Sequence, residues 1–408
     1  METFKRLKIE RWRQFESLDL DFAAPMTVIT GVNGSGKTTI LNILSRHFGW
    51  NLNWTSTIDK KKGKSQFWSD VWSLYDETFL PKSDTVQIGE VHYSSGSICL
   101  LQVPIKVSTQ YSISYQNQVV VEGLYIPSHT QPFSYHRVEN IPTDPKTSAQ
   151  QFQEYQNLLI QLYQSASARN PGLAIKSSII SLAVFGYGNQ AVSENYDFIQ
   201  LFEQFRDVLK LLLPVEVGFE RLEIRMPDVV LVTKSGSFSL DSVSGGIGAL
   251  IGIAWQVLMY GIDKERFVVT FDEPENHLHP AMQRELLPNL EKAFPKAQFI
   301  ISTHSPFIVS SNPNARIYAL NFVEQKVRSR ELSEMELSGD YSETLQEILD
   351  VPLTIPKWVE QKLKDFYDEL VKEGITEESL KKFREKLQNL RLYPQFLRCV
   401  DKLEGKDA

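Results

Sequence analysis

The sequence has 408 residues, and its 43 Lys and Arg against 50 Asp and Glu give a net charge of −7, which argues against a strongly basic protein that coats nucleic acid. A hydrophobic content of 42% and a charged content of 23% are ordinary for a soluble globular protein with two or three domains, or with one large domain and insertions. The two cysteines, Cys99 and Cys399, lie far apart, and the first six residues have no apolar signal core. We therefore expect a cytoplasmic protein with neither a zinc knuckle nor a disulfide framework.

The first 48 residues predict three strands and a helix. Apolar and β-branched residues favour strands over residues 4–12, 18–22 and 26–30, which we expect to belong to one antiparallel layer. Apolar residues at helical spacing over residues 39–48 predict the helix.

A glycine-rich run, Gly-Val-Asn-Gly-Ser-Gly-Lys-Thr-Thr at residues 31–39, separates the third strand from this helix and fits the pattern G-x-x-x-x-G-K-[ST]. Glycines let successive backbone N–H groups converge on a phosphate, and the helix directs its positive end at the same anion. Lys37 then reaches the β- and γ-phosphates of a nucleotide, and the Thr38 hydroxyl binds Mg²⁺. A turn that binds nothing would have no use for the Lys-Thr pair. The predicted phosphate-binding residues are Asn33, Gly34, Ser35, Gly36, Lys37, Thr38 and Thr39.

The segment from residue 49 to residue 145 predicts loops and further strands. The basic run at residues 60–64 is interpreted as a solvated loop, with a contact to a phosphate backbone as the alternative. Alternating residues predict strands at 86–91, 98–103 and 119–126. The Pro-, Ser- and Thr-rich residues 127–145 predict a loop.

Helical spacing over residues 149–163 and 196–213 predicts a helical insertion at about 144–215, which Pro171-Gly172 and Gly186-Tyr187-Gly188 interrupt. Strands are expected at residues 217–225, 229–233 and 237–240. Residues 242–262 carry no charge and are about long enough to cross a bilayer. The glycines and the glutamine in this stretch favour a buried core helix over a membrane span.

Ser244, Gly245 and Gly246 open this apolar helix. Free N–H groups, a hydroxyl and the positive helix end make a second anion site there. A serine is also an ordinary N-cap, so this signal depends on its order with the other motifs.

The strand predicted at residues 267–271 ends in Asp272 and Glu273. Consecutive side chains of a strand point to opposite faces, so the two carboxylates can have different tasks. We expect Asp272 to hold Mg²⁺ and Glu273 to act as the general base for water. A strand-terminal acidic turn without a function is the alternative.

His304 follows a strand predicted at residues 298–302, after a helix expected at 280–294. An imidazole at a strand tip can donate a hydrogen bond to a γ-phosphate. The alternative is a structural histidine. A further strand is expected at residues 316–320, and residues 341–408 predict a charged helical tail interrupted by prolines.

This order of motifs resembles that of the ATP-binding-cassette (ABC) ATPases. Residues 7–15 look like the opening of the RecF, Rad50, SMC and OLD-type branch, and residues 272–280 are similar to the same region of stand-alone Septu- and PARIS-type defence ATPases. The resemblance covers residues 1–48, 86–140 and 217–332. It implies an α/β P-loop NTPase head with a mixed central sheet, an antiparallel β layer and the helical insertion, over residues 1–335, followed by a C-terminal helical region at 336–408.

The resemblance also implies a head-to-head dimer, or a higher homo-oligomer. Each ATP lies between the P-loop of one subunit, which is the glycine-rich run at residues 31–39, and the Ser244-Gly245-Gly246 of the other. The resemblance further implies that Arg13 contacts phosphate. Gln131 is a poor candidate for the family's glutamine that senses Mg²⁺, and Ser128-His129-Thr130 stands where the family often has arginine.

Three functions agree with these motifs. The first is an ATPase that controls a partner protein, a nuclease effector in anti-phage defence. No acidic cluster of a nuclease follows residue 332, so we expect the nuclease to be a separate protein. The second is a RecF- or Rad50-like DNA-repair ATPase that binds DNA directly, which the negative net charge weakens. The third is the motor subunit of a membrane transporter, which the long path from Lys37 to Ser244 disfavours; we therefore expect no membrane partner.

Overall fold

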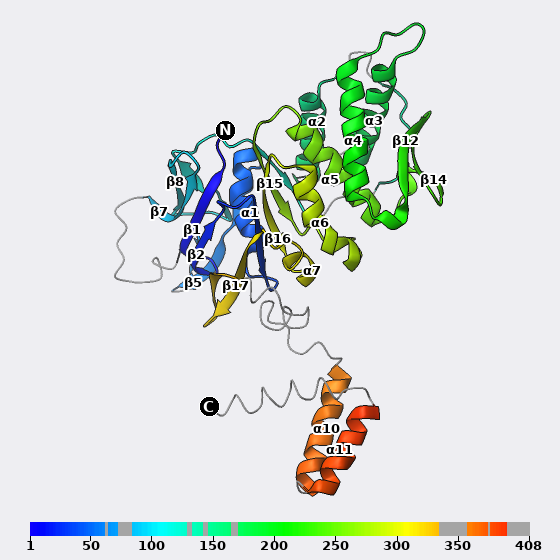
Figure 1. Cartoon of the computed structure of the whole chain (residues 1–408). Coiled ribbons are helices and arrows are strands. Elements are labelled where there is room, and N and C mark those ends of the chain that lie inside the picture. Colours follow the sequence, from blue (N-terminus) through cyan, green and yellow to red (C-terminus); the bar gives the residue numbers. More distant parts are fainter. Residues whose placement is uncertain are drawn as a thin grey trace. The chain divides into compact units, whose positions relative to one another are not determined.

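A computed structural model describes residues 1–61, 64–71, 84–128, 133–141, 146–164, 170–333, 357–373 and 376–389. The chain divides into two compact units, Met1–Asp350 and Val351–Ala408, which are described separately (Figure 1). The domain boundary predicted at residue 335 falls in a segment outside the described residues and stays a prediction.

The larger unit is built on an eleven-stranded sheet with the order β10-β8-β7-β1-β2-β18-β17-β3-β16-β15-β11. Strands β11, β15, β16, β3 and β17 run parallel to one another, whereas β2, β1, β7, β8 and β10 form an antiparallel series. Strand β18 joins the two parts, antiparallel to β17 and parallel to β2. The sheet strands are β1 (Phe4–Trp12), β2 (Phe15–Asp21), β3 (Met26–Gly31), β7 (Thr85–Tyr93), β8 (Ile98–Pro104), β10 (Ser114–Gln116), β11 (Gly123–Ile126), β15 (Phe267–Asp272), β16 (Ala297–Thr303), β17 (Arg316–Val323) and β18 (Lys326–Glu331).

The prediction that β3 belongs to one antiparallel layer with β1 and β2 is wrong. Strand β3 lies between β17 and β16 and is parallel to both. All six of its residues are buried, as expected for a strand covered on both faces, whereas β1 exposes part of its residues to solvent. The glycine-rich run follows β3 and therefore lies at the carboxyl edge of the parallel strands.

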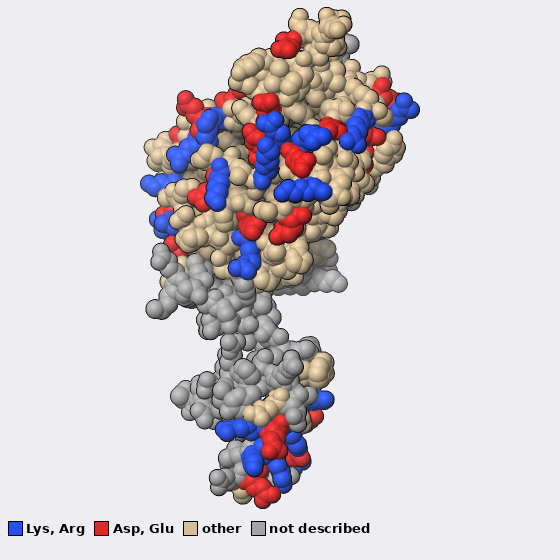
Figure 2. All heavy atoms as spheres, turned by 45° about the vertical axis from the view of Figure 1, so that its right-hand side comes forward, with Lys and Arg blue, Asp and Glu red and all other residues tan. Residues whose placement is uncertain are grey.

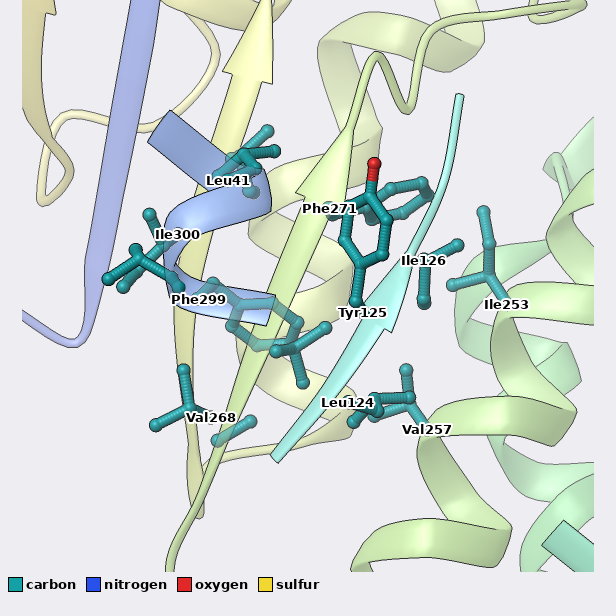
Figure 3. Packing of buried hydrophobic residues seen from close by; sticks show 14 of the residues in the cluster. Leu41, Leu124, Tyr125, Ile126, Ile253, Val257, Val268, Phe271, Phe299 and Ile300 are labelled. Atoms are coloured by element: carbon teal, nitrogen blue, oxygen red, sulfur yellow. The ribbon is translucent and has the colours of Figure 1, made fainter. Parts of the chain in front are cut away.

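Helices cover both faces of the parallel strands. Leu124 and Ile126 of β11 point toward Val257 and Ile253 of α5 (Gly245–Gly261), as Figure 3 shows. The intervening Tyr125 points to the opposite face, where its ring meets the Trp50 ring edge-on at 5.1 Å between centroids, just after α1 (Lys37–Ser45) and the 3-10 helix Arg46–Phe48. The two helices that follow the nucleotide motifs are α6 (Pro280–Ala293) and α7 (Pro306–Val309).

Helix α5 occupies the uncharged stretch for which a core helix and a membrane span were compared. It has 17 residues, most of them buried within the larger unit. Across the described part of the chain, no helix combines the length and apolar character that a membrane crossing needs.

The helical insertion contains three long helices, α2 (Ser148–Gln164), α3 (Pro171–Tyr187) and α4 (Tyr196–Leu212) (Figure 1). The breaks expected at Pro171-Gly172 and at Gly186-Tyr187-Gly188 fall at helix ends, since α3 begins at Pro171 and ends at Tyr187, but α3 itself was not predicted. Pro171 takes the first position of α3, where its missing N–H costs nothing. The Asn170 side chain caps this helix by accepting from the Gly172 N–H at 2.8 Å.

A small antiparallel sheet follows the insertion and leads into α5. Its strands are β12 (Phe219–Arg225), β13 (Asp228–Thr233) and β14 (Gly236–Ser239), flanked by the 3-10 helices Val215–Val217 and Leu240–Ser242. The fully buried ammonium of Lys176 on α3 donates to the carboxylates of Asp228 and Asp241 and to the His136 carbonyl at 2.9 Å. Because Asp241 lies three residues before Ser244, this network ties the insertion to the start of α5.

Two short strand pairs were not predicted. Strand β4 (Trp54–Thr55) pairs with β9 (Gln110–Tyr111), and β5 (Thr57–Lys61) pairs with β6 (Lys64–Trp68). The basic run interpreted as a solvated loop is therefore partly a hairpin, since Lys60 and Lys61 lie in β5 and Lys64 in β6. A run of charges does not reveal strand pairing, which depends on the partner segment.

The smaller unit contains α10 (Lys357–Glu373) and α11 (Glu377–Asn389), in agreement with the helical pattern of the tail. Its helices are linked by an ion pair between Lys386 Nζ and Glu369 Oε2 at 2.6 Å. The proline interruptions predicted at Pro352, Pro356 and Pro394 lie outside the described residues.

Candidate functional site

The glycine-rich run forms a loop whose backbone only glycine adopts without strain. Gly31, Gly34 and Gly36 have φ angles of +147°, +83° and +100°. A Cβ atom on Gly36 would lie 2.4 Å from Gln14 Nε2 and from Phe15 Cζ, so the β1–β2 turn closes against the loop. Helix α1 starts directly after Gly36 with no side-chain cap and no acidic residue in its first turn. Its first N–H groups are therefore available to an anion.

Lys37 is nearly buried at the start of α1. Its ammonium donates to the Gly31 carbonyl at 2.7 Å and to the Val32 carbonyl at 3.2 Å, so the side chain lies back over the loop. Burial lowers the pKa of Lys37, and the carboxylates of Glu273 and Asp272 oppose that effect. Ser35 Oγ in the same loop is buried without a hydrogen bond among the described residues, which agrees with a loop shaped for an additional polar ligand.

Thr38 and Asp272 meet although they come from opposite ends of the sequence. The Thr38 hydroxyl donates to Asp272 Oδ2 at 3.0 Å, and the Ser302 hydroxyl donates to Oδ1 of the same carboxylate. Burial raises the pKa of Asp272, while the hydrogen bonds from Ser302 and Thr38 lower it. A hydroxyl and a carboxylate are the oxygen ligands that Mg²⁺ takes in nucleotide sites, where substrate phosphates and water complete its shell.

No group of three or more His, Cys, Asp or Glu side chains in the described ranges is arranged to hold a metal alone. The Thr38–Asp272 pair thus fits a metal that is shared with a phosphate ligand.

Glu273 follows β15 with a φ of +49°, an uncommon backbone for a side chain other than glycine. Its N–H donates to the Ser302 carbonyl at 2.9 Å. Its Oε2 accepts from Asn276 Nδ2 at 3.3 Å, and its Oε1 lies 3.4 Å from His304 Nδ1. The carboxylate is therefore held between Asn276 and His304 at the end of the strand.

His304 follows β16, the strand between β15 and β3. Its half-exposed imidazole places Nδ1 3.4 Å from both Glu273 Oε1 and Glu275 Oε1. The structure thus brings Lys37, Thr38, Asp272, Glu273 and His304 to the carboxyl edge of three neighbouring parallel strands.

Sequence reasoning assigned no role to Glu275 or Asn276, which lie within residues 272–280. Glu275 is almost fully buried, and burial raises the pKa of its carboxyl group. Its Oε1 accepts from the Thr303 hydroxyl at 2.6 Å and from the His304 N–H at 2.9 Å. One signal for Glu275 was available in the sequence. It is a second carboxylate, two residues after Glu273, in the turn that follows an apolar strand.

Ser244, Gly245 and Gly246 lie at the start of α5, where Ser244 makes no side-chain cap hydrogen bond and is exposed together with Gly245. A Cβ atom on Gly246 would lie 2.7 Å from the His277 carbonyl oxygen, so this helix end packs against the segment after Glu273. Among the described residues, no hydrogen bond joins this helix end to the P-loop of the same chain. A cavity of about 70 Å³ next to it has Gly245, Glu273 and Asn276 in its lining.

Arg13 lies in the β1–β2 turn, beside the Gln14 that contacts the P-loop. Its guanidinium lies 5.7 Å from the Trp12 ring centroid and 5.5 Å from that of Trp54, and its Nε is 3.8 Å from an oxygen of Asp70. The contact between Arg13 and phosphate stays a prediction. The Ser128 carbonyl accepts from Asn276 Nδ2 at 3.0 Å, whereas His129, Thr130 and Gln131 lie outside the described residues.

Two family models match the chain, an AAA domain over residues 6–167 and a second AAA domain, described under type IV toxin–antitoxin systems, over residues 155–310. The Septu protein PtuA of Bacillus thuringiensis is 24% identical over 379 residues, which cover 86% of this chain and 84% of that protein. The retron Vc95 probable ATPase of Vibrio cholerae is 30% identical over 158 residues, which cover 36% of this chain and 30% of that protein.

Solved SMC head domains also match. The head domain from Thermotoga maritima is 14% identical with a TM-score of 0.43, covering 81% of this chain and 99% of that domain. A head domain bound to the C-winged helix domain of ScpA is 13% identical with a TM-score of 0.46, covering 81% of this chain and 97% of that one. The two AAA-domain matches overlap and together run from residue 6 to residue 310, so most of the chain resembles AAA-domain P-loop ATPases, and it is similar to Septu PtuA and to a retron ATPase.

Proposed function

We propose that this chain binds ATP with Mg²⁺, hydrolyses it, and uses the nucleotide to join two copies head to head. The observation that carries the proposal is the meeting of Lys37, Thr38, Asp272, Glu273 and His304 at the ends of β3, β15 and β16. Ligands of open α/β sheets bind at such carboxyl edges.

Each residue in this site has a task that its contacts support. Lys37 and the first N–H groups of α1 bind the phosphates. Glu273, held by Asn276, accepts a proton from the attacking water, and His304 donates to the γ-phosphate. Thr38 and Asp272 would hold Mg²⁺, which neutralises phosphate charge when bound.

The second part of the proposal concerns the dimer. Ser244 and Gly245 are exposed at a helix start that has no contact with the P-loop of its own chain among the described residues. In a head-to-head pair, this start faces the nucleotide on the other subunit, and the free N–H groups of α5 bind its terminal phosphate. Nucleotide state then sets the association of the two heads.

The third part concerns the biological role. The relatives named Septu PtuA and retron ATPase support a place in anti-phage defence, and we propose that the nucleotide-switched dimer controls a nuclease partner. Recovery of a nuclease with the full chain from its native host tests this part separately. Purification of the intact chain without any companion would contradict it.

Direct binding of DNA is the alternative output. On the face of the larger unit drawn in Figure 2, Lys and Arg are interspersed with Asp and Glu. Ion pairs Arg6–Asp19, Arg316–Asp21 and Arg328–Glu16 use basic side chains along β1, β17 and β18. Such mixed charge does not favour a backbone-binding stripe. DNA affinity that falls steeply with salt would overturn this preference.

A mixing experiment tests the composite site. Lys37→Ala removes the P-loop cation, and Ser244→Arg blocks the helix start without removing a cap hydrogen bond. Each variant alone should hydrolyse no ATP. An equimolar mixture should recover roughly a quarter of wild-type activity, because half of the dimers carry one intact site. The surface variant Lys296→Ala is the control. Recovery of nothing, with an active wild type, would contradict the head-to-head dimer and leave the ATPase standing.

A further inference from the structure

We propose that Glu275 is a positioning residue that holds His304 and selects the proton-bearing ring nitrogen of this histidine. The inference rests on the proposed ATPase function for its kinetic consequence, although its structural consequence is independent of nucleotide. It adds a third carboxylate to the site formed by Asp272 and Glu273.

The carboxylate of Glu275 fixes the backbone on which His304 stands. Oε1 accepts from the Thr303 hydroxyl at 2.6 Å and from the His304 N–H at 2.9 Å. The Thr303 hydroxyl in turn accepts from the Ser305 N–H at 3.0 Å. Three consecutive residues, from the last residue of β16 onward, are thus bound to one oxygen or to its donor, which fixes the backbone position of the imidazole.

The same oxygen also faces the ring. It lies 3.4 Å from His304 Nδ1, and Glu273 Oε1 lies at the same distance on that nitrogen. Two carboxylate oxygens beside one ring nitrogen favour a proton on it, because an unprotonated nitrogen would present its lone pair to negative charge. Nδ1–H is then fixed toward the acids, and Nε2 faces the ligand, where it donates to the γ-phosphate when the ring carries its second proton.

The burial of Glu275 indicates that its charge has a use. The residue is 5% exposed, and its Oε2 has no hydrogen-bond partner among the described residues. A buried carboxylate with an unsatisfied oxygen costs folding free energy. A glutamine could accept from the Thr303 hydroxyl and the His304 N–H at lower cost, so the anchoring role alone does not explain an acid here.

Glu275→Gln separates the two roles. The amide oxygen can still accept from Thr303 and from the His304 N–H, but the negative charge beside Nδ1 is gone. Glu291→Gln is the control, because Glu291 is a partly buried acid with one side-chain donor, Asn312 Nδ2 at 2.8 Å, and it lies outside the site.

The first measurement is ¹⁵N NMR of the histidine side chains in the nucleotide-free full chain, with the His304 signals assigned by their loss in His304→Gln. The wild type and Glu291→Gln should show His304 with its proton on Nδ1. Glu275→Gln should show a population moved toward the Nε2–H form. Unchanged His304 signals in Glu275→Gln would overturn the inference, whatever the enzyme does.

The second measurement is ATP turnover. Glu275→Gln should lower kcat by about tenfold with the Kd for ATP changed less than about twofold, as for partners that orient a functional side chain. The double variant with His304→Gln should be no slower than His304→Gln alone, because both changes act through the same imidazole. Additive losses would overturn the inference.

Two further results keep the outcomes distinct. A wild type without ATPase activity but with the Nδ1–H signal would contradict the proposed function and leave the inference standing. If Glu275→Gln does not fold, Glu275→Asp withdraws the carboxylate from the ring while it keeps the charge, and it should also move the His304 proton toward Nε2. An unaltered His304 spectrum in that variant would count against the inference.

Discussion

The Thr38 hydroxyl and the Asp272 carboxylate are joined by a hydrogen bond of 3.0 Å, although 234 residues separate them in the sequence. The bond connects the first turn of α1 to the end of β15. The fold therefore places two oxygen ligands suited to Mg²⁺ side by side.

Asp272→Asn should remove most of the Mg²⁺ dependence of ATP hydrolysis. The amide can still accept from Thr38 and Ser302, but it is a poorer ligand for a hard cation than a carboxylate. Turnover measured across a Mg²⁺ titration should fall at least about tenfold at every concentration. The same titration with EDTA should abolish the wild-type activity. A wild-type response to Mg²⁺ in Asp272→Asn would exclude Asp272 as a ligand.

Lys37→Ala should weaken ATP binding about a hundredfold or more. A charge-assisted contact to phosphate contributes up to about 3 kcal/mol, and Lys37 is the only lysine of the glycine-rich run at residues 31–39. Isothermal titration calorimetry measures the change, with Lys296→Ala as a control for an exposed lysine. Equal affinity in the two variants would show that Lys37 does not touch the nucleotide.

Glu273→Gln should bind ATP normally and hydrolyse it about 100- to 10,000-fold more slowly, the range expected for loss of a general base. Because ATP persists in this variant, light scattering should detect a stable ATP-dependent dimer. Glu291→Gln should remain like the wild type. Normal turnover in Glu273→Gln would assign the base to another residue.

Gly36→Ala should destabilise the chain by at least about 2 kcal/mol more than Gly34→Ala, because overpacking adds to the backbone strain. Both glycines have positive φ angles, so both substitutions introduce backbone strain. A Cβ on Gly36 would also clash with Gln14 and Phe15 at 2.4 Å, whereas nothing lies within 4 Å of a Cβ on Gly34. Urea unfolding of the two variants measures the difference, and equal losses would contradict the close approach.

His47 should make the chain less stable in acid. Burial lowers its pKa from 6.5 to about 4, with Nδ1 donating to the Leu44 carbonyl and Nε2 accepting from the Tyr93 hydroxyl. The folded chain thus binds fewer protons than the unfolded chain, so stability is complete above pH 6.5 and is lost as the pH falls toward 4, by up to about 3 kcal/mol.

His47→Gln should flatten the dependence of the urea midpoint on pH over this window. Carboxylates also titrate near pH 4, so the comparison is made between the wild type and the variant at each pH. Identical slopes between pH 6.5 and pH 4.5 would exclude His47 as the cause.

Local patterns in the sequence were sufficient for the elements that carry the nucleotide motifs. Strand β3, the loop after it and α1 are contiguous, so spacing and glycine content predict them. The end of β15 at Asp272 and the buried α5 were predicted for the same reason. The conformation of each of these elements depends on residues within about ten positions along the sequence.

The predictions that failed concern partners distant in the sequence. The position of β3 in the sheet depends on β16 and β17, which follow it by more than 250 residues. Strand β18 was missed because its pairing with β2 and β17 decides its conformation. Helix α3 was missed for a local reason, since a proline marks the first turn of a helix as readily as its end.

Glu275 shows the limit for the site itself. Its sequence position two residues after Glu273 was visible, but its contact with the His304 N–H follows from the sheet order. Spacing alone does not state which strand lies beside β15.

The parallel register of β15, β16 and β3 limits where the length of the chain can change. Asp272 is paired with Ser302, and Thr303 with Thr30, so the backbone ladder fixes the relative heights of all three chain segments. Deleting one residue inside β15 or β16 would displace its terminal side chain by about 3.3 Å and turn it to the other face. Homologous chains can therefore vary freely in the lengths of the connections between these strands, while length changes inside the strands are excluded.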